Sequence, residues 1–323
     1  MDSELLNSLR MITPEEQKIL DGKTDVEKSL YSTTKEFVID SGKMLERGKL
    51  IDLRPNTRFV HFPKHRHNYV EIIYMCSGTT THIINGQTTI TLKQGELLFL
   101  NQNASQEILP AGENDIAINF IILPEFFDMS FSMMKDENVL RDFLVGSLRK
   151  DFRMGDYLHF QVTDILPIQN LMENMIWSLL NKQPNRRYIN QTTMGLLFLQ
   201  LINCTDRISQ NNPAQYEQNL VFTCLKYIEE NYKTASLTEL AKITSLPVYQ
   251  LSRLIKQYSH FTFTELLQQK RLNQAAFLLS TTKLPVEHII AAVGYDNTSY
   301  FHKIFRKHFL TTPRSYRCAE TDH

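Results

Sequence analysis

The sequence predicts a multidomain α+β protein, with an N-terminal β-barrel, a helical region, and a C-terminal all-α domain that carries two helix-turn-helix motifs. Three observations support this prediction. Short strand-like segments separated by turn residues recur between residues 49 and 123, as they do in barrels and sandwiches. Apolar residues follow a helical period from residue 166 onward. One helix-turn-helix pattern then occurs twice before the C-terminus.

The composition is that of a globular protein, with 42% hydrophobic and 22% charged residues among 323. The zero net charge hides an asymmetry. Residues 1–215 hold 22 basic and 26 acidic side chains, a net charge of −4, whereas residues 216–323 hold 13 and 9, a net charge of +4. Between residues 237 and 317 the count is 11 against 4, or +7. This excess suits contact with phosphates, although an ordinary solvated surface would look the same.

Several features point to the cytoplasm. The four cysteines lack C-x-x-C spacing, so they predict neither a zinc site nor a disulfide framework. The first ten residues lack the apolar core of a signal peptide. No run approaches the roughly 18 apolar residues of a membrane span. We therefore expect a cytoplasmic protein with no membrane partner.

The N-terminal half begins with a polar, mixed segment over residues 1–48, which predicts short helices with a turn near Asp21-Gly22. Segments rich in β-branched and aromatic residues follow, and Asn85-Gly86 between two of them is typical of a type I′ hairpin. The predicted strands are residues 49–62, 69–76, 79–84, 87–92, 96–100, 106–109 and 115–123. Alternate strand positions should line the barrel, and they include Ile73, Met75, His82, Ile84, Phe99 and Phe120.

Potential metal ligands lie early in this region. His65, His67, Glu71 and Gly78 have the spacing H-x-H-x3-E-x6-G, which resembles the first motif of cupin barrels. Metal-binding cupins use these positions and a fourth histidine as ligands, so the resemblance implies that His65, His67 and Glu71 would be ligands here. Gln106 stands at that fourth position here. Three ligands with an open position could still hold iron, manganese or zinc.

We assign no metal and no cofactor to this site, and expect instead a pocket that contacts a small-molecule effector. Small-molecule pockets are mostly apolar with a few polar groups. Simple core packing is the alternative for the apolar members. The candidate effector contacts are His65, His67, Glu71, Ile73, His82 and Phe99.

Helical segments occupy the middle of the chain. Residues 126–134 and 139–149 are interpreted as helix with loop, and residues 166–180 and 192–208 show helical periodicity with a wide apolar face. The polar run over residues 209–216 is typical of a linker. The predicted domains are residues 1–48 (helical segment), 49–164 (barrel), 165–208 (helical region), 209–216 (linker) and 217–318 (double helix-turn-helix).

The first helix-turn-helix pattern runs from Leu240 to Lys256. Residues at steps of three and four are expected to face inward, namely Leu240, Ile243, Leu251, Leu254 and Ile255. The outward face of the second helix then carries Tyr249, Ser252, Arg253 and Lys256. Arg253 suits bidentate contact with guanine, and Tyr249 and Ser252 suit other base contacts. Lys256 suits a phosphate.

The second pattern runs from Ile289 to Lys307. Its predicted core is Ile289, Val293, Phe301, Ile304 and Phe305. Gly294 fits a turn that requires a residue without Cβ, and Asp296 or Asn297 can cap the next helix. The predicted base contacts are Thr298, Ser299, His302 and Lys303, and the predicted phosphate contacts are Arg306 and Lys307. The apolar face of residues 263–280 predicts a helical connector between the two patterns.

The run from Leu237 to Arg317 resembles the DNA-binding domain of AraC/XylS-type bacterial transcription regulators. The match is densest over residues 293–308 and 312–317. Pro247 stands where a serine N-cap is usual, and Ile290 replaces a small alanine. Leu310 replaces a glycine, which is unfavourable if that position has a positive φ.

The resemblance implies an effector-responsive, sequence-specific transcription regulator with a cupin-like sensing domain. Its two recognition helices would enter successive major grooves of double-stranded DNA, roughly 34 Å apart. The resemblance also implies a homodimer formed through a helix pair within residues 165–208, and RNA polymerase as a partner if the protein is an activator. Packing of that pair on the barrel is the alternative.

Two other interpretations remain. One is a metal-dependent cupin enzyme, an isomerase or a dioxygenase, with an auxiliary DNA-binding domain. The other is a constitutive DNA-binding protein whose barrel is only a scaffold.

Overall fold

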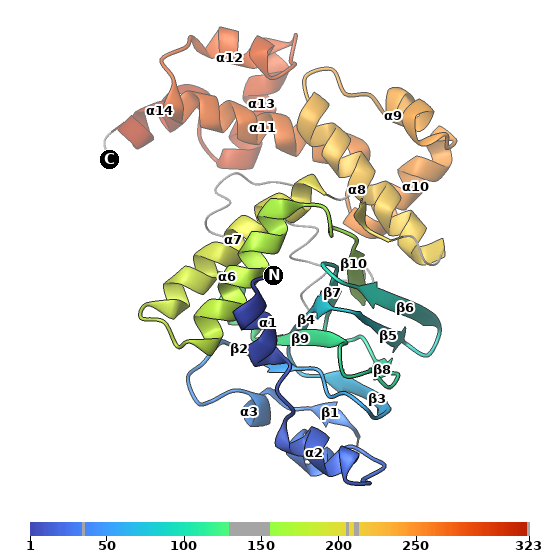
Figure 1. Ribbon diagram of the computed structural model, residues 1–323. Helices are drawn as coiled ribbons and strands as arrows, with labels where there is room; N and C mark the ends of the chain where they lie inside the picture. The colour runs from blue at the N-terminus through green and yellow to red at the C-terminus, as the bar shows by residue number, and fades with distance from the viewer. Residues whose placement is uncertain (34–35, 129–155, 205–206, 210–212, 322–323) are drawn as a thin grey trace. The chain divides into compact units, whose positions relative to one another are not determined.

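The computed structural model describes residues 1–33, 36–128, 156–204, 207–209 and 213–321. These residues form two compact units, and the boundary falls between Asn219 and Leu220, inside helix α8 (Pro213–Asn231) (Figure 1). The helix predicted over residues 139–149, and most of that over 126–134, lie outside the described residues. Within the described ranges, no helix combines the length and apolar character needed to cross a bilayer.

Two five-stranded sheets form the centre of the first unit. The first sheet contains, in order, β1 (Val38–Ile39), β3 (Phe62–His67), β8 (Gln106–Ile108), β5 (Thr79–Ile84) and β6 (Thr88–Lys93). The second contains β10 (Tyr157–Phe160), β7 (Leu97–Leu100), β4 (Val70–Ser77), β9 (Ile116–Ile122) and β2 (Ile51–Pro55). The expectation of a barrel is therefore corrected. Each sheet is hydrogen bonded separately among the described strands, and the two form a sandwich rather than a closed ring.

The predicted hairpin is confirmed. Asn85 and Gly86 both have positive φ, at +54° and +67°, as a type I′ turn requires. The Gln87 amide donates to the Ile84 carbonyl at 3.1 Å and closes the turn, but the register pairs Ile84 with Thr88, so three residues rather than the predicted two join β5 to β6. This register places Ile90 and Leu92 in the interior core with Ile84.

Two predicted interior residues, Phe99 and Phe120, lie on the other face of their sheet. Ile72 is paired with both of them, whereas its neighbour Ile73 is paired with Leu98 and lies in the interior core with Met75 and Ile84. The Phe99 ring lies 5.6 Å from that of Phe160 and 6.3 Å from that of Phe198 in helix α7. Phe99 therefore packs toward helices rather than into the sandwich. Its strand is apolar on both faces, so the sequence pattern could not assign the direction.

A helix pair, α6 (Leu166–Leu180) and α7 (Arg186–Asn203), covers that outer face (Figure 1). Tyr74 of β4 donates its hydroxyl to Gln169 Oε1 of α6 at 2.7 Å. Gln191 of α7 donates to the Phe126 carbonyl at 3.2 Å. The first helix has the predicted bounds, but the second begins six residues before Thr192. Described residues of the predicted linker, from Pro213 on, belong to α8 instead.

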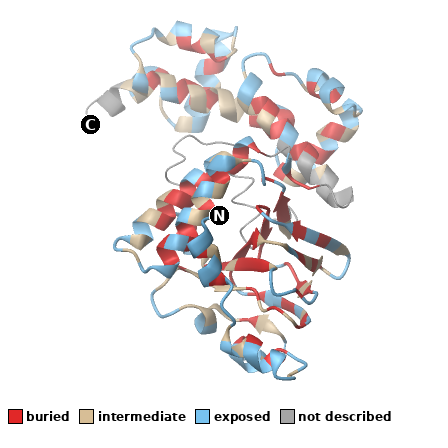
Figure 2. Cartoon of the chain, viewed as in Figure 1, coloured by how far each residue is buried: buried red, intermediate tan, exposed pale blue. Residues whose placement is uncertain are grey.

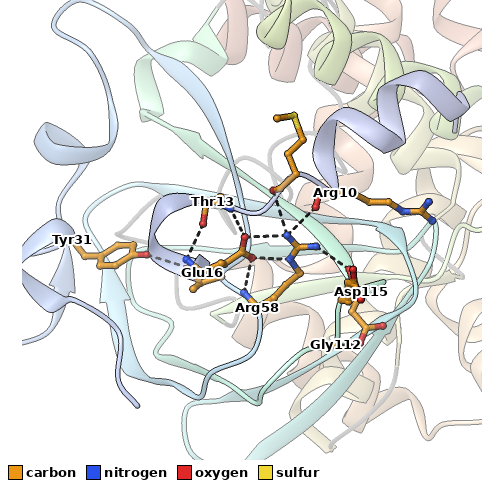
Figure 3. A network of polar contacts seen from close by, with 10 residues as sticks. Arg10, Thr13, Glu16, Tyr31, Arg58, Gly112 and Asp115 are labelled. Carbon is orange, nitrogen blue, oxygen red and sulfur yellow. Dashed lines mark hydrogen bonds and ion pairs between the residues drawn. The ribbon is translucent and has the colours of Figure 1, made fainter. Parts of the chain in front are cut away.

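Short helices precede the sandwich, as predicted: α1 (Ser3–Leu9), α2 (Pro14–Leu20), the 3₁₀ turn η1 (Lys28–Leu30) and α3 (Ser41–Met44). A second 3₁₀ turn, η2 (Pro124–Phe126), follows β9. A buried ion pair docks α2, because Arg58 Nε and Nη2 donate to the two oxygens of Glu16 at 2.7 and 3.0 Å (Figure 3). Burial opposes the charge of Glu16, but the hydrogen bonds from Arg58 and Thr13 outweigh it and lower its pKa.

The second unit is helical. After the C-terminal part of α8 come α9 (Leu237–Thr244), α10 (Val248–Ser259), α11 (Phe263–Thr281), α12 (Val286–Ala292), α13 (Thr298–Phe309) and α14 (Pro313–Thr321). Side chains define most of the starts. Ser236 accepts from the Glu239 amide, and Thr262 forms a capping box with Glu265. The two predicted helix-turn-helix motifs are thus α9–α10 and α12–α13, joined by α11.

Each motif buries one side of its helices (Figure 2). Phe301 and Phe305 of α13 pack with Ile289, Ile290 and Val293 of the α12 segment, and Ile304 is partly buried against them. In the first motif Leu240, Leu251, Leu254 and Ile255 are buried as predicted. The prediction that Ile243 faces inward is wrong, because 58% of its surface is exposed. Leu240 and Ala241 define the inward side of α9, and the helical turn places Ile243 away from it.

Candidate functional site

The outward face of α10 carries the polar residues predicted for the first motif. Leu251, Leu254 and Ile255 are buried on one side, so the helical period places the intervening positions on the other. Tyr249 is 76% exposed, Arg253 and Lys256 are exposed, and Ser252 is half-buried. An aromatic ring, a hydroxyl and a guanidinium are therefore presented together on one helix face, with an ammonium one turn further on.

The outward face of α13 is built in the same way. Phe301 and Phe305 hold the helix on the core. The predicted contacts are all exposed, namely Thr298, Ser299, His302, Lys303, Arg306 and Lys307, and Tyr300 and His308 are exposed beside them. Asn297, one of the two predicted caps, accepts from the Tyr300 amide at 2.9 Å. Hydroxyls at the N-terminal end and cations toward the C-terminal end match the division between base and phosphate contacts in helix-turn-helix proteins.

Gly294 places the turn of the second motif against the loop that follows α8. Its φ is +89°, and a Cβ there would lie 2.5 Å from the Lys233 carbonyl oxygen and 3.0 Å from Lys233 Cα. Any larger residue would push this turn off the loop, so the prediction that the position requires a glycine is confirmed.

Arg271, in the middle of α11, is a positioning residue that the sequence did not single out. Its Nε donates to the Tyr232 carbonyl at 2.7 Å, and its Nη2 donates to the Lys233 carbonyl at 2.8 Å. Its guanidinium also lies over the Tyr295 ring, 5.3 Å from the centroid. One side chain thus joins the loop after α8, the connecting helix and the second turn. Only the position of an arginine on α11 could have suggested this role.

A chain of polar side chains fills one end of the sandwich. The Thr80 hydroxyl and His82 Nε2 are 2.8 Å apart, and His82 Nδ1 and Gln106 Oε1 are 3.2 Å apart. Gln106 Nε2 then donates to Glu71 Oε2 at 2.7 Å and faces His65 Nε2 at 3.4 Å. The structure therefore brings together His65, Glu71 and His82 of the predicted effector contacts, with Gln106 as their common partner.

His67 completes this polar cluster without a hydrogen bond of its own. Its Nε2 lies 3.4 Å from Glu71 Oε2, yet neither ring nitrogen has a hydrogen-bond partner within the described part of the chain. The ring is 2% exposed. A buried imidazole with two unused polar atoms is unfavourable unless something else satisfies them.

Burial keeps this cluster uncharged near neutral pH. It raises the pKa of Glu71 to about 8, although the hydrogen bond from Gln106 acts in the opposite direction. Burial lowers the pKa values of His65 and His82 to about 4 and holds that of His67 well below its usual range. The cluster therefore presents neutral donors and acceptors.

A cavity of about 40 Å³ adjoins the cluster. His65, Tyr69 and Glu71 line it from the sandwich, and Tyr31 and Met44 line it from the N-terminal segment. The space holds one or two water molecules, so a larger ligand requires the N-terminal segment to move. Ile73 lies in the apolar core of the sandwich.

The same geometry does not suit a metal ion. The amide nitrogen of Gln106 is a hydrogen donor and lies next to both Glu71 and His65, where a fourth ligand would have to offer a lone pair. Among the described residues, no three His, Cys, Asp or Glu side chains are grouped so that they could hold a metal.

Two family models match separate parts of the chain. A family model described as an AraC-like ligand binding domain matches residues 55–129, and one described as a helix-turn-helix domain matches residues 240–319. The HTH-type transcriptional activator RhaR of Mannheimia succiniciproducens is 24% identical over 269 residues, which are 79% of this chain and 87% of the relative. RhaS of an Enterobacter species is 24% identical over 273 residues, or 83% and 91% of the two chains.

Solved structures give similar matches. The C-terminal domain of AraT, a response regulator from Geobacillus stearothermophilus, is 32% identical over 34% of this chain and 88% of its own, with a TM-score of 0.30. An apo ToxT variant from Vibrio cholerae is 14% identical and covers 84% of this chain and 98% of its own, with a TM-score of 0.35.

Proposed function

The chain belongs to the AraC family of transcription regulators, and from this premise we propose how it reads DNA and responds to a signal. The protein is a DNA-binding transcription regulator. In our proposal α10 and α13 enter successive major grooves on one side of a duplex. The observation that carries the proposal is the repeated face of exposed polar and cationic residues, each on a helix whose other side is buried.

Base contacts are proposed for Tyr249, Ser252 and Arg253 on α10, and for Thr298, Ser299, His302 and Lys303 on α13. Arginine reads guanine O6 and N7 in a bidentate manner, and hydroxyl and imidazole groups bond several base edges. Lys256, Arg306 and Lys307 are proposed to contact phosphates, because they lie toward the C-terminal ends of their helices. Arg271 holds the second motif against the loop after α8, so that both helices keep one spacing.

The interior of the sandwich is proposed to sense an uncharged, polar small molecule. The neutral Glu71 carboxyl lines the cavity, and the unpartnered Nε2 of His67 lies 3.4 Å from its Oε2; both observations support this proposal. A ligand that bonds both groups would relieve an unfavourable burial. Because the relatives are transcription activators, we propose an activating, cytoplasmic homodimer that has RNA polymerase as a partner.

Selection from a random duplex pool with the full chain tests the DNA proposal. The expected product is a site with two half-motifs whose centres are about one helical turn apart. Selection with the Tyr249→Ala/Arg253→Ala variant should erase one half-motif and leave the other. A pool that enriches no sequence, or a variant that erases both halves together, would contradict the proposal.

Thermal-shift titration of the full chain with pentoses, hexoses and deoxyhexoses tests the sensing proposal. At least one sugar should raise the melting temperature of the wild type, and His67→Phe should abolish that shift. An identical shift in both proteins would place the ligand elsewhere.

A further inference from the structure

A second cavity of about 170 Å³ lies outside the sandwich, next to strand β2 of the second sheet. It is lined by residues 48–52, which lead into and form the start of β2, by Phe126 of η2, by Leu179 of α6, and by Arg186, Arg187 and Asn190 of α7. All of these residues belong to the first unit. A dry cavity of about 150 Å³ accommodates a benzene molecule, so this one has room for a small organic ligand.

One wall of the cavity is apolar and made of Leu50, Ile51, Phe126 and Leu179. The first turn of α7 also lines the cavity. Its N-cap Asn185 has a positive φ and no side chain caps the helix among the described residues, although the Arg186 amide donates to the Gln183 carbonyl at 3.2 Å. Uncapped amides at a helix N-terminus favour an anion. Arg186 is half-buried and Arg187 is exposed on that turn.

Asn190 gives a second, independent indication that the cavity binds a ligand. It is fully buried on the cavity wall, and neither its amide nitrogen nor its oxygen has a hydrogen-bond partner in the described part of the chain. An unpartnered buried amide costs about 1–3 kcal/mol. A ligand that accepts from its nitrogen would offset that cost.

The charged residues around the cavity favour a negatively charged ligand. Asp52 and Glu46 both bond the same lysine, Lys49, at 2.8 and 3.0 Å. Neither Arg186 nor Arg187 forms an ion pair within the described ranges, although Arg186 is close enough to Glu46 to contribute to the lowered pKa of that carboxyl. The excess charge is therefore positive, at the end where the uncapped helix begins.

We propose that this cavity binds a small carboxylic acid with an apolar body of about six or seven carbons. The carboxylate would take the arginine, amide and helix N-terminal donors, since guanidinium groups bind carboxylates in a bidentate manner. The hydrocarbon body would lie on Leu50, Ile51 and Phe126. The ligand would bridge β2 to the helix pair, at a place separate from the polar cluster inside the sandwich.

Calorimetric titration of the full chain with cyclohexanecarboxylate, and with its neutral isostere cyclohexanecarboxamide, tests this proposal. The acid should bind saturably and at least tenfold more tightly than the amide. The Arg186→Gln/Arg187→Gln variant, whose changes are at least partly exposed and so leave the fold intact, should lose tenfold or more in affinity. The matched control is Arg66→Gln, an exposed arginine of β3, which should leave the affinity unchanged.

Hydrogen exchange with the acid bound locates the site. Protection should increase at residues 48–52 and 186–190. Absence of saturable binding, equal affinity for the amide, or protection at residues 62–71 in place of α7 would each overturn the proposal. The site does not depend on sensing inside the sandwich, because His67→Phe should leave binding of the acid intact.

Discussion

At the scale of single residues, the polar cluster of the sandwich shows how burial decides protonation. Glu71 is 2% exposed and its pKa is raised to about 8, so the folded protein holds a proton there that the unfolded chain releases near its ordinary pKa. The neighbouring histidines have lowered pKa values and stay neutral. Stability of the first unit therefore has two opposite pH dependences.

Glu71→Gln should remove the alkaline dependence. A pKa raised in the folded state gives stability that is complete below the unfolded value of 4.5 and is lost as pH rises through about 8. The buried histidines give the opposite dependence below their ordinary pKa of 6.5. Denaturant unfolding of the wild type should therefore show the decline between about pH 6.5 and pH 8, and the variant a flatter curve in that range. The control is Glu113→Gln, a substitution at an exposed position of the loop before β9. Parallel curves for wild type and Glu71→Gln would refute the assignment.

Arg253→Ala should weaken binding to the selected site by about 1–3 kcal/mol and relax the preference at one base pair, because it would remove the proposed bidentate contact with a base. Fluorescence anisotropy with the selected site and its single-base variants measures both effects. Lys256→Ala is the comparison, since loss of a phosphate contact should weaken every sequence alike. If Arg253→Ala also weakened all sequences equally, Arg253 would be a phosphate contact.

At the scale of elements, the sequence was most informative where a local pattern had one solution. The Asn85-Gly86 hairpin and the strands around it follow from alternation and turn chemistry, and the motif helices follow from apolar steps of three and four. β1 is only two residues long and β10 only four, which is too short for a period to show. Phe99 was misplaced because its strand is buried on both faces, and sheet closure depends on long-range pairing that no local pattern records.

The candidate site divides in the same way. The exposed faces of α10 and α13 could be predicted, because apolar residues at helical spacing mark the buried side of a helix and the residues on its other side are then exposed. Gln106 was located by motif spacing, although its role as a shared donor to Glu71 and His65 needed the structure. Arg271 could not be assigned, because its acceptors are backbone carbonyls of a loop nearly forty residues away, and carbonyls leave no trace in a sequence.

The end of α13 offers a test at this scale. Leu310 has a φ of +58° and is 87% exposed, so it carries left-handed strain without compensating burial. Leu310→Gly should stabilise the second unit by about 1 kcal/mol, seen as a higher melting temperature and slower hydrogen exchange over residues 298–317. Leu284→Gly, which does not occupy a positive φ, should instead destabilise. Equal effects of the two substitutions would argue against strain at Leu310.

At the scale of the whole molecule, charge is unevenly distributed along the chain. The excess of +7 between residues 237 and 317, beside −4 over residues 1–215, concentrates the attraction to phosphates in one unit. Not every cation there is free to bind DNA. Arg271 bonds backbone carbonyls, and Lys270 pairs with Glu229, so the sequence count exceeds the number available for contact.

The affinity for DNA should therefore fall as the salt concentration rises, with a slope set by a small number of phosphate contacts. Three contacts per protomer, at Lys256, Arg306 and Lys307, predict a slope of about −3 in a plot of log K against log salt for each protomer bound to its site. Anisotropy titrations of the full chain between 50 and 200 mM NaCl measure this slope, and neutralising all three residues to glutamine should bring it close to zero. A slope unchanged by the triple variant would place the phosphate contacts on other side chains.

The Lys233 carbonyl oxygen contacts two elements of the second unit. It accepts from Arg271 and abuts Gly294, and it lies two residues beyond α8, the helix in which the chain passes from one unit to the other. One backbone oxygen thus contacts both the connecting helix α11 and the turn that precedes α13. Any change that moved this oxygen would disturb an arginine donor and a close-packed glycine together, so the orientation of α13 within the second unit depends on a peptide group that no side-chain substitution can remove.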